Sequence, residues 1–240
     1  MKKSIEIVCH KGANAHAPEN TFASSQLCID WGMDYVEIDV NTSQDGVLYL
    51  LHGPDVERTT NGKGLISELS SADIDSLDAG SWFSPKFAGE PVPRLESFLK
   101  RIKGKIKVFF DVKYPVEPQQ VIAMVYQAGL ERECFFWFER HTEALKFRKL
   151  DRQLLLKVNA RSVKEAALAK DELGANIVEI GLDDMNQELL QACRQIGLKV
   201  MINYMGNDPE AFRKILRWQV DMVNVDYGDE FVRALQLFES

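Results

Sequence analysis

Residues 35–40 read YVEIDV. Its β-branched residues predict a short strand, and the alternation of strand side chains puts Glu37 and Asp39 together on one face. A strand with valine and isoleucine on its other face is typical of a parallel sheet that is covered on both sides. Two carboxylates inside such a strand need a partner, because burying an unpaired charge is costly.

The rest of the chain repeats the same rhythm, with short β-branched or aromatic runs alternating with amphipathic stretches. This pattern is typical of βαβ units with a parallel sheet. Nine strands are predicted, at residues 5–10, 35–40, 47–52, 107–113, 134–138, 154–158, 177–181, 199–204 and 222–226. A barrel requires eight, and the second and third runs are separated only by NTSQDG, so we expect those two to pair locally. We predict an α/β fold, a (β/α)8 TIM barrel, as one domain over residues 1–240.

The helices between the runs have clear boundary signals. Asp208 and Pro209 predict a helix start before Phe212, Ile215 and Leu216, which share one helical face. In the helix before it, the apolar face is predicted to consist of Leu189, Cys193 and Ile196, and Gly197 is predicted to end the helix.

One region, about residues 53–93, is rich in turn residues and lacks the alternation. We interpret it as a short insertion after the second barrel strand, at one end of the barrel. Loops of this length usually carry function or cover a site. Its aromatic residues Trp82, Phe83 and Phe87 either form a small core within the insertion or a lip over a site.

Composition excludes several classes of protein. The chain has 240 residues, of which 45% are hydrophobic and 27% charged, and a net charge of −7 without a block of basic residues, so a nucleic-acid partner is not expected. No run approaches a signal sequence or a membrane span, so we expect a cytoplasmic protein without a stable membrane anchor. The four cysteines are widely spaced, which predicts reduced, buried thiols. Nothing here predicts an oligomeric state.

Unusual polar side chains fall at the carboxyl ends of the predicted strands, where the active sites of barrels lie. They are His10, Glu37, Asp39, His52, Asp111 and Lys113. If the carboxylates converge, their repulsion requires that one bind a proton or that they face a cation. Oxygen ligands favour Mg²⁺ or Ca²⁺. Asp111 either joins such a site or simply pairs with Lys113.

A cation at this end, with Lys11 and Lys113 beside it, suits an anionic substrate. Two histidines that titrate near neutrality can divide the roles of general base and general acid. Together these groups describe phosphodiester cleavage.

Three segments carry a family resemblance: HKGANAHAPENTFASS, YVEIDVNTSQDGVLYLLH and VERTTNGKG. They resemble the glycerophosphodiester phosphodiesterase family, whose pattern runs His-Arg-Gly, Pro-Glu-Asn-Thr, Glu-x-Asp-Val, Thr-x-Asp-Gly, His-Asp and Arg-Thr-Thr. The match is strong from Ile7 to about Lys113 and continues weakly to the C-terminus. The resemblance implies a barrel with a short insertion that hydrolyses a glycerophosphodiester to an alcohol and glycerol 3-phosphate, using one divalent cation, Mg²⁺ or Ca²⁺.

The resemblance also implies roles by position. Metal binding falls to Glu37, Asp39 and Asp111, acid and base catalysis to His10 and His52, and phosphate binding to Lys11 and Lys113. Two further residues are candidates for lining the pocket, Glu179, which is equally well a charge on the barrel rim, and Tyr204. Asp226 either closes the last turn or belongs to the site.

This chain departs from the family pattern at four places. Lys11 stands for arginine, Asp111 for a glutamate, Gly53 for an aspartate, and INYMGND, with Tyr204, for Trp-Thr-Val-Asn. The alternatives are a different diester, such as a lysophospholipid or another polyol diester, and a non-catalytic barrel that binds a phosphorylated ligand. The order of the two histidines and the nucleophile, water or a substrate hydroxyl, stay open.

Overall fold

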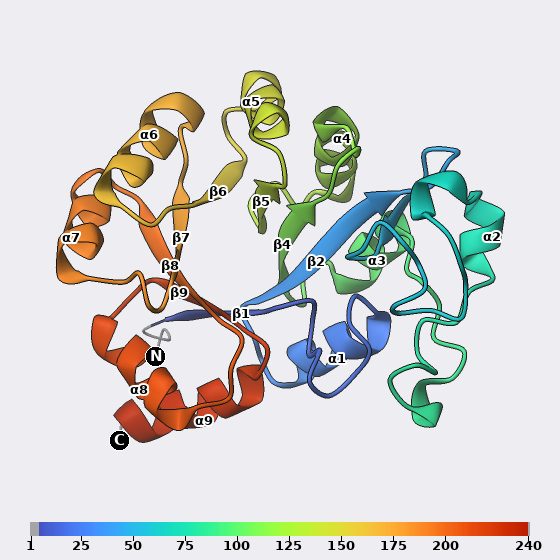
Figure 1. Ribbon diagram of the computed structural model, residues 1–240, viewed down its shortest axis with the longest axis horizontal. Coiled ribbons are helices and arrows are strands. Elements are labelled where there is room, and N and C mark those ends of the chain that lie inside the picture. Colours follow the sequence, from blue (N-terminus) through green and yellow to red (C-terminus); the bar gives the residue numbers. More distant parts are fainter. Residues whose placement is uncertain (1–4, 240) are drawn as a thin grey trace.

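The computed structural model describes residues 5–239 and forms a closed barrel of parallel strands (Figure 1). Residues 1–4 and 240 of the predicted domain lie outside the described part. The barrel strands are β1 (Glu6–Cys9), β2 (Tyr35–Thr42), β4 (Lys107–Val112), β5 (Cys134–Phe138), β6 (Leu155–Asn159), β7 (Ile177–Gly181), β8 (Lys199–Tyr204) and β9 (Met222–Val225). β1 pairs with both β9 and β2, which closes the barrel and confirms the predicted fold.

The ninth predicted run forms β3 (Leu48–Leu50), which pairs antiparallel with β2. The predicted local pairing of the second and third runs is therefore confirmed. β3 contacts the Val40–Thr42 end of β2, so the chain that follows it starts at the carboxyl end of the barrel.

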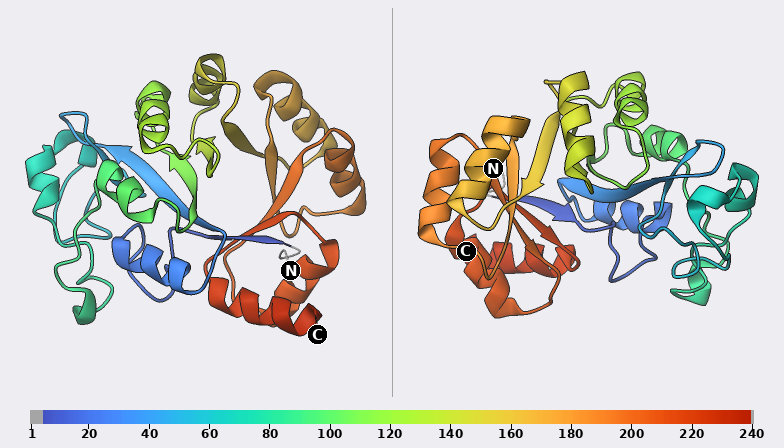
Figure 2. Two further views of the ribbon diagram at one scale, coloured as in Figure 1. Left: turned by 180° about the vertical axis from the view of Figure 1, so that it is seen from behind. Right: turned by 45° about the horizontal axis from the view of Figure 1, so that its top comes forward.

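Eight helices surround the strands (Figure 2). They are α1 (Phe22–Asp30), α3 (Leu95–Ile102), α4 (Pro118–Ala128), α5 (His141–Leu150), α6 (Val163–Leu173), α7 (Gln187–Gln195), α8 (Pro209–Trp218) and α9 (Gly228–Glu239). Between residues 5 and 239, no helix has the length and apolar character that a membrane span requires.

In α8 and α7, the predicted helix boundaries and apolar faces can be compared with the structure. The side chain of Asp208 caps α8 by accepting a hydrogen bond from the backbone N of Glu210, and the predicted apolar face of α8 is buried. In α7, Leu189 and Cys193 are buried, but Ile196 is 38% exposed and the prediction for it was wrong. The helix ends at Gln195, so Ile196 is its C-cap residue and leaves the helical face.

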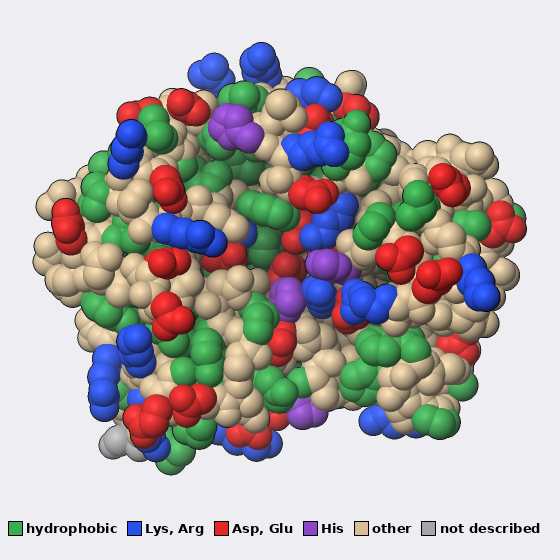
Figure 3. Space-filling view, in the orientation of Figure 1, with side chains coloured by type: hydrophobic (Ala, Val, Ile, Leu, Met, Phe, Trp, Pro, Cys, Tyr) green, Lys and Arg blue, Asp and Glu red, His purple; other side chains and the backbone are tan. Residues whose placement is uncertain are grey.

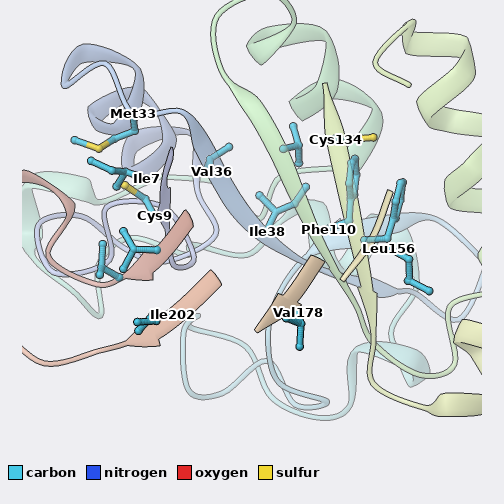
Figure 4. Close-up of a cluster of buried hydrophobic side chains, with 14 of the residues drawn as sticks. Ile7, Cys9, Met33, Val36, Ile38, Phe110, Cys134, Leu156, Val178 and Ile202 are labelled. Carbon is cyan, nitrogen blue, oxygen red and sulfur yellow. The ribbon is translucent and has the colours of Figure 1, made fainter. Parts of the chain in front are cut away.

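The main core fills the space between the barrel strands and the helices. Figure 4 shows Ile7, Ile38, Phe110, Leu156 and Ile202 in this layer. All four cysteines are buried free thiols, as predicted.

A second cluster consists of the alternate strand residues, which point into the barrel. Its members are Val8, Tyr35, Phe109, Phe135, Ile177, Met201 and Met222. The rings of Phe109 and Phe135 stack at 4.4 Å between centroids. Because Glu37 and Asp111 follow Tyr35 and Phe109 by two residues on the same strands, the polar groups lie directly above this apolar plug.

The segment between β3 and α3 holds only short elements: η1 (Ile66–Glu68), α2 (Ser71–Asp75) and η2 (Pro85–Phe87). It lies beside the barrel in Figure 1 and has a small apolar cluster of its own. The rings of Trp82 and Phe83, and of Phe83 and Phe87, meet edge to face at 5.6 and 5.7 Å. These contacts favour the interpretation that the aromatic residues hold the segment together.

Candidate active site

Three carboxylates converge at the carboxyl end of two neighbouring strands. Asp39 of β2 lies opposite Asp111 of β4 in the sheet register, and Glu37 precedes Asp39 by two residues on the same face. One oxygen of each lies within 4.8 Å of the others. Glu37 and Asp39 are buried, and Asp111 is half-buried. The structure therefore brings together all three predicted metal ligands.

Their electrostatics match a cation site. Burial raises the pKa of Glu37. Burial, followed by the charge of Asp39, raises the pKa of Asp111 to about 7. Burial also acts to raise the pKa of Asp39, but Lys113 and the other neighbours outweigh it and hold that pKa below its ordinary value. Without a cation, the cluster therefore resists full ionisation at neutral pH.

The two oxygens of Asp111 have different surroundings. Oδ2 lies 2.7 Å from Nζ of Lys113, which also lies 2.9 Å from Oδ1 of Asp39. Oδ1 of Asp111 is buried and has no hydrogen-bond partner within the described part of the chain. The ion pair expected as an alternative is thus present, yet Asp111 still has one oxygen for a metal ion. An unpaired buried carboxylate oxygen beside two more carboxylates fits a hard divalent cation.

His10 follows the end of β1, and its ring is held by the carboxylate of Asp226, which follows β9. Its Nδ1 lies 2.7 Å from Oδ1 of Asp226, which also accepts a hydrogen bond from the Asn14 amide at 2.7 Å. Burial lowers the pKa of His10, but the charge of Glu37 and the bond to Asp226 outweigh it and raise the pKa to about 9. Because the carboxylate accepts, Nδ1 carries a hydrogen, and the Nδ1 side of the ring faces Asp226.

His52 has the opposite electrostatic environment. Burial lowers its pKa, and Lys11 and Lys113 add to this effect against the charge of Asp39. The amide of Asn41 donates to the backbone oxygens of Leu51 and Gly53, at 3.3 and 3.0 Å, and so fixes the backbone on both sides of His52. In the metal-free protein, the surroundings therefore favour the protonated form of His10 and the neutral form of His52.

The loop after His10 places Lys11 beside Glu19 and Asn20 beside Asp39. Nζ of Lys11 lies 3.7 Å from Oε1 of Glu19, whose carboxylate also accepts two hydrogen bonds from Arg58. Asn20 donates to Oδ2 of Asp39 at 2.7 Å and accepts from its backbone N at 2.9 Å. Lys11 and Asn20 both have positive φ, 54° and 58°, which is uncommon for these residues and is held here by the contacts of the loop.

These groups lie together in the space-filling view. Figure 3 shows histidine, basic and acidic side chains gathered in the hollow at the centre of the barrel face.

The model of the glycerophosphoryl diester phosphodiesterase family matches residues 10–230 of this chain. The chain belongs to this family. The predicted family resemblance is confirmed, and with it membership of a group of phosphoric diester hydrolases.

Relatives in the family cover nearly the whole chain. A glycerophosphodiester phosphodiesterase of Bacillus subtilis is 29% identical, over 95% of this chain and 85% of its own. The crystal structure of a glycerophosphodiester phosphodiesterase from Agrobacterium tumefaciens is 36% identical, with a TM-score of 0.91 over 95% of this chain and 99% of that one. A phosphodiesterase of Oleispira antarctica, solved with the product sn-glycerol-3-phosphate, is 25% identical, with a TM-score of 0.86 over 96% of each chain.

The two residues predicted to line the pocket, Glu179 and Tyr204, have different surroundings in the structure. Glu179 is buried and lines a cavity at the carboxyl end of β6 to β8, where its Oε1 pairs with Nζ of Lys157 at 3.1 Å. Tyr204 packs edge to face on Phe212 of α8, at 5.8 Å between ring centroids. The β8 residue that lines the cavity together with Glu179 is Asn203, the neighbour of Tyr204 on the other face of the strand.

Sequence reasoning missed three asparagines: Asn14, Asn20 and Asn224. Asn224 donates to Oε2 of Glu37 at 2.7 Å and so orients a candidate metal ligand. Asn20 lies inside the Pro-Glu-Asn-Thr motif of the family, and Asn224 is a polar residue within the apolar run MVNV. These two features of the sequence could have marked Asn20 and Asn224 as candidate site residues.

Proposed function

We propose that this protein hydrolyses a glycerophosphodiester to an alcohol and glycerol 3-phosphate with the help of one divalent cation. The observation that carries the proposal is the convergence of three carboxylates with two histidines whose pKa values are shifted in opposite directions. Family membership and the product complex of the Oleispira antarctica relative support the same substrate class.

Glu37, Asp39 and Asp111 would hold one Mg²⁺ or Ca²⁺. The unpaired Oδ1 of Asp111 and the mutual repulsion of the cluster support this set. A bound cation would supply charge neutralisation for the phosphate group.

The directions of the two pKa shifts distinguish the histidine roles. His52, whose pKa is lowered, is neutral at pH 7 and accepts a proton from the nucleophile, either water or a hydroxyl group of the substrate. His10, whose pKa is raised, is protonated at pH 7 and donates its proton to the leaving alcohol. Asp226 retains the hydrogen on Nδ1 of His10, so the proton that moves is the one on Nε2.

The two lysines suit the phosphate oxygens. Lys113 remains charged because Asp39 and Asp111 raise its pKa against the effect of burial. Lys11 offers a single compact charge where an arginine would offer a bidentate fork, so we expect weaker geometric control of the phosphate on its side.

The direct test is release of glycerol 3-phosphate from glycerophosphocholine and glycerophosphoethanolamine, measured with and without EDTA. We expect EDTA to abolish activity and Mg²⁺ or Ca²⁺ to restore it. The substitution His10→Ala is expected to lower kcat by about 10² or more. His141→Ala, which changes an exposed histidine on α5, is the matched control and should leave kcat unchanged.

Activity that persists after chelation would contradict the metal proposal. Full turnover by the His10→Ala variant would contradict the proposed acid. Calorimetric binding of a glycerophosphodiester without product would instead favour the non-catalytic barrel.

A further inference from the structure

A second polar cluster lies across the barrel mouth from the three carboxylates. It is formed by Lys157 and Asn159 of β6, Glu179 of β7 and Asn203 of β8. Nζ of Lys157 donates to Oδ1 of Asn159 at 2.8 Å and to Oε1 of Glu179 at 3.1 Å. Glu179, Asn159 and Asn203 line one cavity of about 470 Å³. None of these residues is used by the proposed catalytic steps.

The cluster is incompletely paired. Glu179 is only 7% exposed, yet among residues 5–239 its Oε2 has no hydrogen-bond partner, and neither has Oδ1 of Asn203. The Asn203 amide nitrogen faces Oε1 of Glu179 at 3.5 Å. The opposite orientation of the amide would place two oxygen atoms against each other, so the orientation in which Oδ1 is unpaired is the favourable one. Buried acceptors in folded proteins are normally satisfied, so these two acceptors at one cavity are positions to which a bound molecule can donate hydrogen bonds.

The cluster is connected to the catalytic groups from two sides. Asn203 lies opposite Asn224 in the sheet register, and Asn224 donates to Glu37. On the other side, Nζ of Lys157 and Nζ of Lys113 lie 5.0 and 5.6 Å from the ring centroid of Trp137. A diester whose phosphate lies beside Lys113 would therefore place one of its organic groups near this cavity.

The hydrogen-bonding groups of the cluster determine which part of a substrate it can bind. An ammonium donor, a carboxylate and amide oxygens beside an aromatic ring can bind several neighbouring hydroxyl groups, each of which donates one hydrogen bond and accepts another. A quaternary ammonium group carries no N–H or O–H donor and would leave Oε2 of Glu179 and Oδ1 of Asn203 unpaired.

We infer that Glu179 and Asn203, supported by Lys157 and Asn159, form a subsite for a polyhydroxylated group of the diester. The inference rests on the proposed function and adds a specificity to it. The polyol is either the glycerol that remains on the phosphate or a polyol in the leaving alcohol. Both sources present the same vicinal hydroxyl groups.

The test compares three substrates of the metal-loaded, full-length enzyme. They are glycerophosphoglycerol, which has a polyol on both sides, glycerophosphocholine, which has one only on the retained side, and bis(p-nitrophenyl) phosphate, which has none. The variant is Asn203→Leu, since Asn203 is half-buried, carries no charge and makes only a long contact, 3.5 Å, to Glu179. Glu188→Gln, an exposed carboxylate on α7, is the matched control.

We expect Asn203→Leu to lower kcat/KM for glycerophosphoglycerol about tenfold or more, mostly through KM, and to leave that for bis(p-nitrophenyl) phosphate unchanged. A loss confined to glycerophosphoglycerol assigns the subsite to the leaving alcohol. An equal loss with glycerophosphocholine assigns it to the retained glycerol. Glu179→Gln, tested with circular dichroism to check folding, should give the same pattern across the substrates.

Equal effects of Asn203→Leu on all three substrates, or no effect on any, would overturn the subsite. That outcome leaves the proposed function standing, because wild-type turnover is measured in the same experiment. Failure of the wild-type enzyme to release glycerol 3-phosphate from either glycerophosphodiester would contradict the proposed function itself.

Discussion

Individual residues determine the protonation states at this site. Asp226 is the clearest case, since it bonds His10 across 216 positions of sequence and raises its pKa. The sequence placed Asp226 near a strand end but left its role open, because only closure of the barrel between β1 and β9 brings the two side chains together. The histidines and carboxylates were predictable from strand alternation and motif. Their hydrogen-bond partners were not, because those depend on register.

Replacing Asp226 tests this pair. In Asp226→Asn, loss of the carboxylate charge should lower the pKa of His10, so the alkaline limb of the kcat/KM profile moves to lower pH. The acid limb, which we assign to His52, should stay in place. Asp229→Asn is a matched control, because Asp229 lies 3.2 Å from Nε2 of His16 away from the site. A uniform loss of activity at every pH would show that Asp226 only positions the ring.

Among the elements, strands were predicted better than the segment after β3. All nine strand runs were recognised because their apolar periodicity is strong. The end of α7 at Gly197 was predicted correctly, and Gly197 has a φ of 70°, but Ile196 was wrongly placed on the apolar face, since periodicity alone does not locate the last helical residue. The path of the segment between β3 and α3 depends on specific side-chain bonds, such as those from Tyr49 and Arg94 to Asp75. Such bonds follow from the fold and carry no periodic signal.

A steric contact within that segment gives a prediction. A Cβ at Gly80 would lie 1.9 Å from the backbone oxygen of Phe87, which cannot move aside without breaking the turn. We expect Gly80→Ala to destabilise the segment by roughly 3 kcal/mol or more. Gly89→Ala meets no atom within 4 Å and carries only the strain of a φ of +82°, about 1–2 kcal/mol.

Limited proteolysis measures the difference between these two variants. Cleavage within residues 78–91 should be faster for Gly80→Ala than for Gly89→Ala. Equal protection of the two variants would mean that the segment adjusts freely around Gly80.

At the scale of the whole molecule, the barrel could be predicted because eight strands alternating with helices leave few other arrangements. The pairing of Asp39 with Asp111 could not, since a shift of register would separate them while keeping the same fold. This convergence makes the site a determinant of global stability as well as a functional feature.

The metal-free protein should therefore lose stability as pH rises. The pKa of Asp111 is about 7 in the folded protein, above its ordinary value of 3.8, so the folded state binds more protons between these values. Stability is then highest below about pH 4 for this group and declines towards pH 7, by on the order of 2–4 kcal/mol.

Thermal unfolding in EDTA measures this effect by comparing the wild type with Asp111→Asn. The variant, which has no carboxylate to ionise at this position, should gain in Tm relative to the wild type as pH rises from 4 to 7. Addition of Mg²⁺ or Ca²⁺ should reverse the order at pH 7. A constant difference in Tm across this range would contradict a raised pKa at Asp111.

The direct pairing of β2 with β4 has a consequence for evolution. Residues 54–93, between His52 and α3, leave and re-enter the barrel between two strands that are hydrogen-bonded neighbours from Tyr35 to Val40. The length of this segment therefore need not affect the spacing of Asp39 and Asp111. Insertions, deletions and duplications in this segment can therefore leave the spacing of the two carboxylates unchanged. A lineage can remodel the surface beside the barrel mouth, and with it the range of molecules admitted, while inheriting the same reactive centre.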